Sequence, residues 1–270
     1  FCGTFINLVF ALASQFAGAV ATVEFLMYFD YFSRIEWGED YHTKYDELAT
    51  LGARPQTVGT RIDAYLQQVV YSINQPAASR GYQSIFWNIS IFDKYYFDSI
   101  FGDFVFPDGS KPNWDSLNML QQKFLKWFNK ERTKALLTFP VVTVALLTEN
   151  NDVKDEEYRY VVAKELSEGQ SMFLYMSESA DSLASCCRLR NELTDNTFSY
   201  SLGAGGVSTG SINVITMNIN RLVQQDLSIE EQVKKIHKYQ AAYHAIIKDY
   251  YDHGLLPAYT SGFISLEKQF

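Results

Sequence analysis

Cysteine is scarce in this sequence, and the scarcity excludes one large class of proteins. The 270 residues contain only Cys2, Cys186 and Cys187, too few for the disulfide framework of a secreted protein of this length. The sequence has no CxxC pair and no HExxH motif, so nothing in it predicts a metal site. We therefore expect a reducing, cytoplasmic environment and no metal bound within this segment.

Positive charge is also in short supply. Lys and Arg number 23 against 31 Asp and Glu, which gives a formal net charge of -8. Nucleic acids are held mainly by Lys and Arg that neutralise their phosphates, so this balance argues against a nucleic-acid partner. A single nucleotide is not excluded, because a few backbone N–H groups at helix N-termini bind phosphates whatever the overall charge.

Basic residues are missing altogether from the first 32 positions, which are largely apolar; the first is Arg34. The length of the run alone would allow a membrane span, but Gln15 and Glu24 interrupt it. A secretory signal peptide carries Lys or Arg before its apolar stretch, and this segment does not. We interpret it as a buried helix or helix pair and expect no membrane partner, with membrane insertion as the alternative.

Pro and Gly are few, at 6 and 15, whereas Phe and Tyr number 20 and 18. This composition favours regular buried elements, and 47% hydrophobic residues suffice for a sizeable core. The sequence starts without Met and is apolar from its first residues, and it ends abruptly at SLEKQF. Domain termini are usually polar and loosely held, so we expect both ends to lie inside a larger fold.

Hydrophobic periodicity predicts helices that alternate with strands. Apolar residues three and four positions apart indicate helices, and nearly continuous apolar runs indicate strands covered on both faces. Asp115 or Ser116 is the expected cap of one helix, and Ser228 with Glu231 forms a capping box for the last one. The expected helices cover 60–72, 116–128, 158–168 and 229–253, and the expected strands cover 82–92, 136–147, 171–176 and 212–219. This alternation predicts an α/β fold with a largely parallel sheet, open or closed into a barrel.

The adjacent pair Cys186 and Cys187 lies between a strand-like run and the glycine-rich stretch SLGAGGVSTGS. A loop in this position is suited to presenting a side chain to a ligand, although two inert core residues are the alternative. The glycines give the backbone freedom to approach a phosphate. They also suit a purely geometric turn, and no Walker-type Lys follows them.

Several long segments, in the same order, resemble the catalytic barrel of anaerobic (class III) ribonucleoside-triphosphate reductases. They are SINQPAASRGYQSIFWNISIFDK, FPDG, LQQKFLKWFNKER, LTFPVVTVALL, ASCCRLR, TGSINVITMNINRL and AYTSGFISLEKQF. The resemblance implies part of a ten-stranded α/β barrel with a central finger loop, and a single partial catalytic domain over 1–270. It also implies that the family's N-terminal nucleotide-binding cone and C-terminal glycyl-radical and zinc region are absent.

The resemblance further implies that Cys187, directly before Arg188, carries the thiyl radical that removes the 3'-hydrogen of the substrate ribose. Cys186 is the less favoured neighbour. Sulfur suits this role because its radical is about as stable as the carbon radical it makes. The remaining candidates, all for substrate binding, are Ser211, Asn213, Asn74, Arg80 and Asn88. Each has a structural alternative, such as a hydrogen bond to backbone at a strand end or a partner for a buried carboxylate.

The family also implies cofactors and partners. These are a glycyl radical generated by an S-adenosylmethionine iron-sulfur activase, formate or a thiol as reductant, and zinc in the C-terminal region. The expected partners are a ribonucleoside triphosphate substrate, nucleotide effectors, the radical-SAM activase and, for the full-length protein, a second copy in a homodimer.

Two other hypotheses stay open from the sequence. A glycyl-radical enzyme of the pyruvate formate-lyase type shares the barrel and adjacent cysteines, although the Arg-Leu after Cys187 favours the reductase. The other hypothesis is a non-catalytic chain that complements separately encoded pieces of the barrel. Because open strand edges would remain in a partial barrel, we predict that the isolated chain reduces no ribonucleotide even with an activase present; turnover would contradict this.

Overall fold

The computed structural model describes residues 1–15, 19–49, 56–78, 81–180, 182–184, 190–192, 218–225, 227–255 and 257. The chain divides into two compact units, Phe1–Val207 and Ser208–Phe270, and each is described by itself. The single domain expected over 1–270 stays a prediction.

The first unit contains all the strands described. Its helices are α1 (Cys2–Gln15), α2 (Phe25–Trp37), η1 (Tyr41–Lys44), α3 (Val58–Ile73), α4 (Lys94–Phe101), α5 (Trp114–Arg132) and α6 (Glu156–Ser167). Its strands are β1 (Val20–Thr22), β2 (Leu48–Ala49), β3 (Gln56–Thr57), β4 (Trp87–Phe92), β5 (Val141–Glu149), β6 (Asp152–Val153), β7 (Phe173–Ser177), β8 (Ser182–Ala184) and β9 (Arg190–Glu192).

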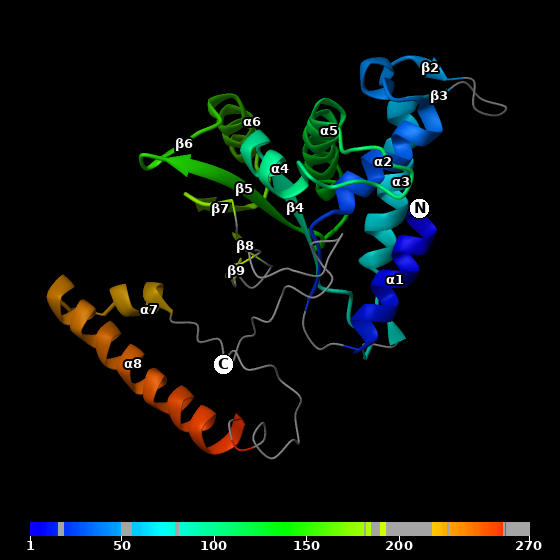
Figure 1. The fold of residues 1–270 in the computed structure, drawn as a ribbon. Helices are drawn as coiled ribbons and strands as arrows, with labels where there is room; N and C mark the ends of the chain where they lie inside the picture. The colour runs from blue at the N-terminus through cyan, green and yellow to red at the C-terminus, as the bar shows by residue number, and fades with distance from the viewer. Residues whose placement is uncertain are drawn as a thin grey trace. The chain divides into compact units, whose positions relative to one another are not determined.

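The main sheet is built on parallel strands, as the alternation of elements predicts. β4 pairs in parallel with β1 on one side and with β5 on the other, and β5 pairs in parallel with β7. The short β6 is antiparallel to the end of β5. Figure 1 shows helices α4, α5 and α6 together on one side of β5. The mixed α/β class is therefore confirmed, whereas the ten-stranded closure and the finger loop stay predictions.

The apolar start of the chain folds as the expected helix pair, α1 and α2, with the short strand β1 between the helices. Phe5 of α1 and Phe25 of α2 pack with their ring centroids 4.6 Å apart, and both rings contact the buried Trp87 of β4. The segment thus lies in the core of the first unit. None of the helices in the described ranges is both long and apolar enough to cross a membrane.

The cap of α5 differs from the predicted one. Asn113, rather than Asp115 or Ser116, precedes the helix, and its Oδ1 accepts hydrogen bonds from the backbone N–H of both residues, at 2.9 and 3.3 Å. Asn113 has an extended backbone, which is the conformation of an N-cap residue. Three of the four residues from 113 to 116 cap helices well, so composition alone does not choose among them.

Strand β5 begins later than the sequence indicates. The apolar run 136–147 was expected to be extended throughout, but β5 spans Val141–Glu149 and Leu136 is 96% exposed. Pro140 immediately precedes the strand, and proline has no N–H to donate to a neighbouring strand. Hydrophobicity therefore predicted the existence of the strand correctly and its start incorrectly.

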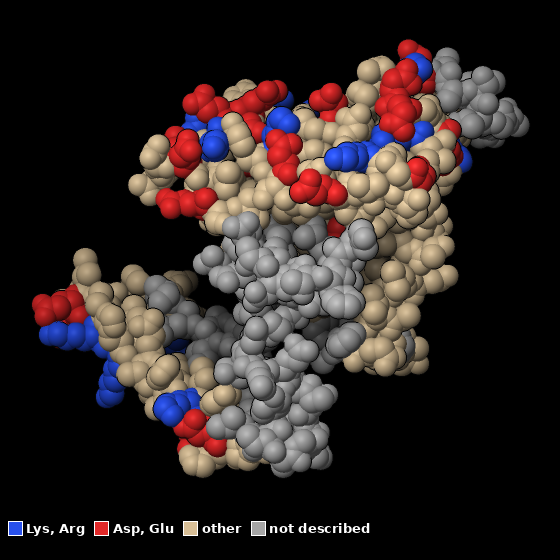
Figure 2. Space-filling model, viewed as in Figure 1, with Lys and Arg blue, Asp and Glu red and all other residues tan. Residues whose placement is uncertain are grey.

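Charged side chains lie on the outer surface of the first unit. Figure 2 shows Asp and Glu interspersed with Lys and Arg over the helices. Three exposed ion pairs of this region are Lys94–Asp98, Lys154–Glu149 and Arg159–Asp152. Exposed pairs of this kind contribute little to stability, about 0–1 kcal/mol each, so the fold depends mainly on its apolar core.

The second unit contains α7 (Ile219–Val223), α8 (Ile229–Tyr250) and the turn η3 (Tyr251–Leu255). The predicted capping box is confirmed, since Ser228 Oγ accepts from the N–H of Glu231 while the Glu231 carboxylate accepts from the N–H of Ser228. The strand predicted over 212–219 lies mostly outside the described residues. Its last residue, Ile219, begins helix α7, so that end of the strand was wrong.

Candidate active site

The predicted site residues divide into two groups. Five of them lie outside the described residues: Cys186, Cys187, Ser211, Asn213 and Arg80. Their roles stay predictions. Asn74 and Asn88 are described, and they occupy different positions in the first unit.

Asn88 belongs to a set of three polar side chains on one face of the sheet, here called the polar row: Asn88 and Ser90 of β4 and Thr143 of β5. Side chains alternate between the two faces of a strand. Because Trp87 packs on the aromatic rings of α1 and α2, Asn88 and Ser90 point to the opposite face. Ser90 pairs with Thr143 in the parallel register, so all three side chains share that face.

The polar row is almost completely buried. Asn88, Ser90 and Thr143 are 1%, 2% and 3% exposed. The Asn88 amide donates to the Val141 carbonyl at 2.9 Å and to Thr143 Oγ1 at 3.1 Å. Ser90 Oγ, in contrast, has no hydrogen-bond partner within the part of the chain that the structure describes. An unpaired buried hydroxyl costs about 1–3 kcal/mol, so this is the least satisfied position of the row.

Ser90 and Thr143 were not among the site residues predicted from the sequence. A signal was present in WNISIF, where Asn88 and Ser90 alternate with apolar residues in a strand buried on both faces. A period of two among polar residues indicates a common face. The pairing with Thr143 had no such signal, because it depends on the register between two strands about fifty residues apart.

Asn74 has a different position, at the end of α3. Its Nδ2 donates to the carbonyls of Val70 and Phe139 at 2.8 and 2.7 Å, and its Oδ1 accepts from the N–H groups of Thr138 and Phe139, both at 3.0 Å. These four bonds use the full capacity of a primary amide. Asn74 therefore fixes the end of α3 to the segment before β5, and its role in substrate binding stays a prediction.

The carboxyl end of β4 is fixed by two buried side chains. Asp93 accepts hydrogen bonds from the N–H of Tyr96 at 2.8 Å, which caps α4, and from the N–H of Leu147 in β5 at 2.7 Å. Burial raises the pKa of its carboxyl. Gln121 of α5 bonds both the N–H and the carbonyl of Phe92, at 2.8 and 3.1 Å. Ligands of open α/β sheets bind outside the carboxyl ends of the strands. Ser90 lies two residues before this end of β4, whereas Thr143 is the third residue of β5.

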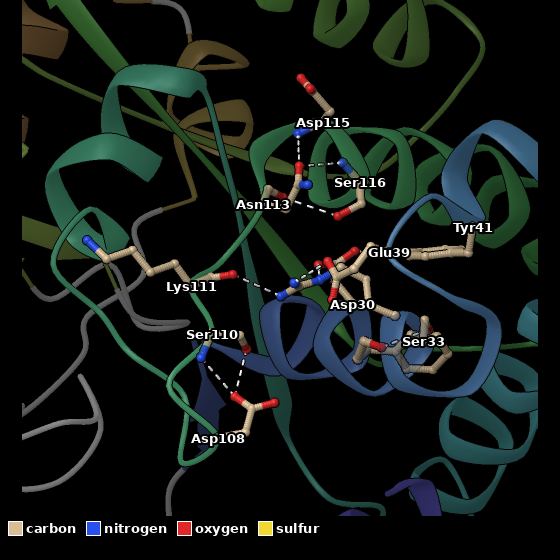
Figure 3. A network of polar contacts seen from close by, with 12 residues as sticks. Asp30, Ser33, Glu39, Tyr41, Asp108, Ser110, Lys111, Asn113, Asp115 and Ser116 are labelled. Atoms are coloured by element: carbon tan, nitrogen blue, oxygen red, sulfur yellow. Dashed lines mark hydrogen bonds and ion pairs between the residues drawn. The ribbon is translucent and has the colours of Figure 1, made fainter.

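A second polar cluster, shown in Figure 3, joins α2 to η1 and to the segment before α5. Asp30 and Arg34 are 1% and 4% exposed. Asp30 accepts from Tyr41 Oη at 2.8 Å and from Arg34 Nε at 3.1 Å, and Arg34 also donates to the Lys111 carbonyl and to Glu39. Burial raises the pKa of the Asp30 carboxyl, while Tyr41 and Arg34 act in the opposite direction. The partners of this cluster all lie within the protein, which indicates a structural role.

Cys2 lies at the start of α1 and is partly buried. Burial raises the pKa of its thiol to about 11, so very little of it is thiolate near neutral pH, and the thiolate is the reactive form. This environment gives no support for a catalytic role at Cys2, to which the sequence analysis had assigned none. Among the described residues, no group of three or more His, Cys, Asp and Glu side chains is placed to hold a metal ion.

Comparison with known proteins extends this description. The family model for anaerobic ribonucleoside-triphosphate reductase matches residues 1–269. No curated protein sequence matches the chain. The chain is similar to the solved anaerobic ribonucleotide reductase from Thermotoga maritima with citrate in the active site, with 28% identity and a TM-score of 0.61 over 100% of this chain and 46% of that one.

Two further solved structures give similar values. The Thermotoga maritima enzyme in complex with dATP and CTP has 28% identity and a TM-score of 0.59, over 100% of this chain and 43% of that one. A structure described as an anaerobic ribonucleotide reductase has 28% identity and a TM-score of 0.60, over 100% and 41%. The chain thus spans less than half the length of these solved relatives.

A parallel sheet covered by helices, with buried polar side chains in its strands, is typical of α/β enzymes. Within that class, the match over 1–269 is decisive. The chain belongs to the anaerobic ribonucleoside-triphosphate reductase family. This result favours the reductase over the pyruvate formate-lyase alternative.

Proposed function

We propose that the protein containing this chain reduces ribonucleoside triphosphates to 2'-deoxyribonucleoside triphosphates, and that the chain supplies part of its catalytic barrel. The observation that carries the proposal is the family match over almost the whole chain, residues 1–269. The solved relative in complex with dATP and CTP supports a nucleotide as the substrate class. The order of parallel strands and outer helices supports a place in a barrel with a finger loop.

In the proposed reaction, the sulfur of Cys187 takes the hydrogen atom from C3' of the ribose and forms an S–H bond. The 2'-hydroxyl then takes up a proton and leaves as water. Two electrons and a proton pass to C2' as formate is oxidised to carbon dioxide, or a pair of thiols to a disulfide, and the S–H hydrogen atom returns to C3'. A glycyl radical made by a radical-SAM activase supplies the unpaired electron in this family. Cys186 is its neighbour, and Asn88, Asn74, Arg80, Ser211 and Asn213 are the proposed substrate-binding residues.

The remaining parts of the proposal concern the whole protein. We propose that the whole protein also has a nucleotide-binding cone and a glycyl-radical and zinc region, and that it forms a homodimer. Nucleotide effectors and the activase are its proposed partners, and the cytoplasm is its proposed location. Support for each comes from membership of the family.

Protection of Cys187 from alkylation tests the proposal. With the whole gene product that contains these residues, we expect CTP to slow the reaction of Cys187 with iodoacetamide at pH 8 at least tenfold, because a bound nucleotide would cover the sulfur. Mass spectrometry of the peptide with both adjacent cysteines measures the rate. Cys2 is the internal reference: its thiol pKa of about 11 makes it react roughly a hundredfold more slowly than an ordinary cysteine, with or without CTP.

Two results would count against the proposal. Equal rates at Cys187 with and without saturating CTP would show that no nucleotide covers it. Acylation of a cysteine on incubation with pyruvate would instead support an enzyme of the pyruvate formate-lyase type.

A further inference from the structure

One group in the polar row is not accounted for by the fold. Asn88 and Thr143 bond each other at 3.1 Å, whereas Ser90 Oγ has no partner among the residues that the structure describes. Ser90 is 2% exposed, so water does not freely replace the missing bond. Native proteins pair most buried polar atoms, and an exception calls for an explanation such as a ligand.

The chemistry of the row indicates what would bind it. Its three side chains are neutral, and Asn88 bonds the Val141 carbonyl and the Thr143 hydroxyl rather than a charged side chain. A buried phosphate would need cationic side chains or several backbone N–H donors, and the three side chains of the row supply neither. A sugar hydroxyl is neutral and both donates and accepts one hydrogen bond, as the serine hydroxyl does. The row therefore suits the ribose of a nucleotide better than its phosphates.

The position of Ser90 in the sheet also supports a ligand-binding role. Ser90 lies on the sheet face opposite α1 and α2, two residues before the end of β4 that Asp93 and Gln121 hold in place. In barrels of parallel strands the helices lie outside, and the opposite sheet face points to the barrel interior. A side chain on a rigid strand is also held more precisely than one on a loop.

From these observations we infer that Ser90 is a substrate-binding residue whose hydroxyl bonds a ribose hydroxyl of the nucleotide. The inference rests on the proposed function and adds a residue to its site. The Asn88 amide bonds Thr143. Ser90 is therefore the member of the row whose hydroxyl can both donate a hydrogen bond to a ligand and accept one from it.

The test uses Ser90→Ala in the whole gene product, with Thr143→Val as a control that also removes one hydroxyl. CTP and 2',3'-dideoxy-CTP are the probes, and calorimetry measures their Kd. We expect Ser90→Ala to raise the Kd of CTP about tenfold, the loss of roughly one good hydrogen bond. The Kd of the dideoxy probe should change less than twofold, because it lacks the hydroxyls that Ser90 would bond.

Urea unfolding followed by tryptophan fluorescence gives the second readout. Ser90→Ala should leave the unfolding midpoint unchanged or raise it, because it removes a hydroxyl that has no hydrogen-bond partner among the described residues. Thr143→Val should lower the midpoint, since it leaves the Asn88 amide short of an acceptor. If Ser90 had only a structural role, Ser90→Ala would lower the unfolding midpoint as Thr143→Val does.

The outcomes separate this inference from the function on which it rests. If the unaltered protein binds CTP and Ser90→Ala binds it equally well, the inference is wrong and the function stands. A lowered midpoint for Ser90→Ala would also overturn it, because the hydroxyl would then be paired inside the protein. If the unaltered protein does not bind CTP, the proposed function fails, and the inference fails with it.

Discussion

Replacing Arg34 with Met should lower the free energy of unfolding of the first unit by about 3–5 kcal/mol. The substitution keeps much of the aliphatic packing but leaves the carboxylate of Asp30, 1% exposed, without its ionic partner. Removing one member of a buried ion pair costs more stability than the attraction between the two charges contributes, because the other charge stays buried without its partner. Urea unfolding measures the effect, and all four tryptophans, Trp37, Trp87, Trp114 and Trp127, lie in this unit.

Lys44→Met is the matched control. Lys44 pairs with Asp40 at the same i,i+4 spacing as Arg34 with Asp30. Both side chains of the Lys44–Asp40 pair are exposed, Lys44 at 46% and Asp40 at 56%. We expect a loss of at most about 1 kcal/mol there. Equal losses for the two variants would contradict the view that burial makes the Asp30–Arg34 pair important.

The loss caused by Arg34→Met should also depend on pH. Burial already raises the pKa of Asp30 above its usual value, and removing the cation raises it further. A carboxyl with a raised pKa in the folded state binds more protons folded than unfolded, so stability increases as the pH falls through that pKa. The variant should therefore recover part of its lost stability in acid, whereas a loss constant with pH would point to packing as its cause.

Replacing Cys187 with Ala should abolish ribonucleotide reduction by the whole gene product, with a decrease of more than about a thousandfold in turnover. Without the sulfur there is no group to take the 3'-hydrogen. Anaerobic turnover with activase and reductant, followed by chromatography of the deoxynucleotide, measures the effect. Binding of CTP should stay within about threefold, because the methyl group leaves the nucleotide site intact.

Cys186→Ala is the control for this prediction. It changes the adjacent residue in the same way, and we expect it to retain at least about a tenth of the activity. An active Cys187→Ala together with an inactive Cys186→Ala would assign the radical to the other cysteine. Loss of CTP binding in Cys187→Ala would show instead that the substitution disturbs the fold.

The elements that the sequence predicted well are those determined by local interactions. Helix α3 follows from apolar spacing and α8 from the capping box of Ser228 and Glu231, both of which involve residues at most a few positions apart. The boundaries that were wrong involve competition between neighbours. Asn113 caps α5 in place of Asp115 or Ser116, and Pro140 delays the start of β5 within an apolar run.

For the candidate site, too, the sequence predicted what local patterns determine and not which distant groups a residue contacts. Asn88 was recognised because an amide in an apolar strand is unusual, but the sequence did not show that it bonds Thr143 of β5. Asn74 was selected as a polar group in an apolar context, and its four bonds reach backbone groups up to 65 residues away. Whether a polar residue faces a ligand or the protein's own backbone depends on such distant partners.

The sequence by itself determined the class of fold, the helix pair at the start of the chain and the family, since each follows from local patterns or from long matching segments. Only the tertiary structure decided that Ser90 lies beside Asn88 and Thr143 with no hydrogen-bond partner in the described part of the chain, and that Arg34 and Asp30 are buried together. The physical reason is that strand register and burial depend on packing between segments far apart in the chain, and periodicity within one segment carries no information about its neighbour.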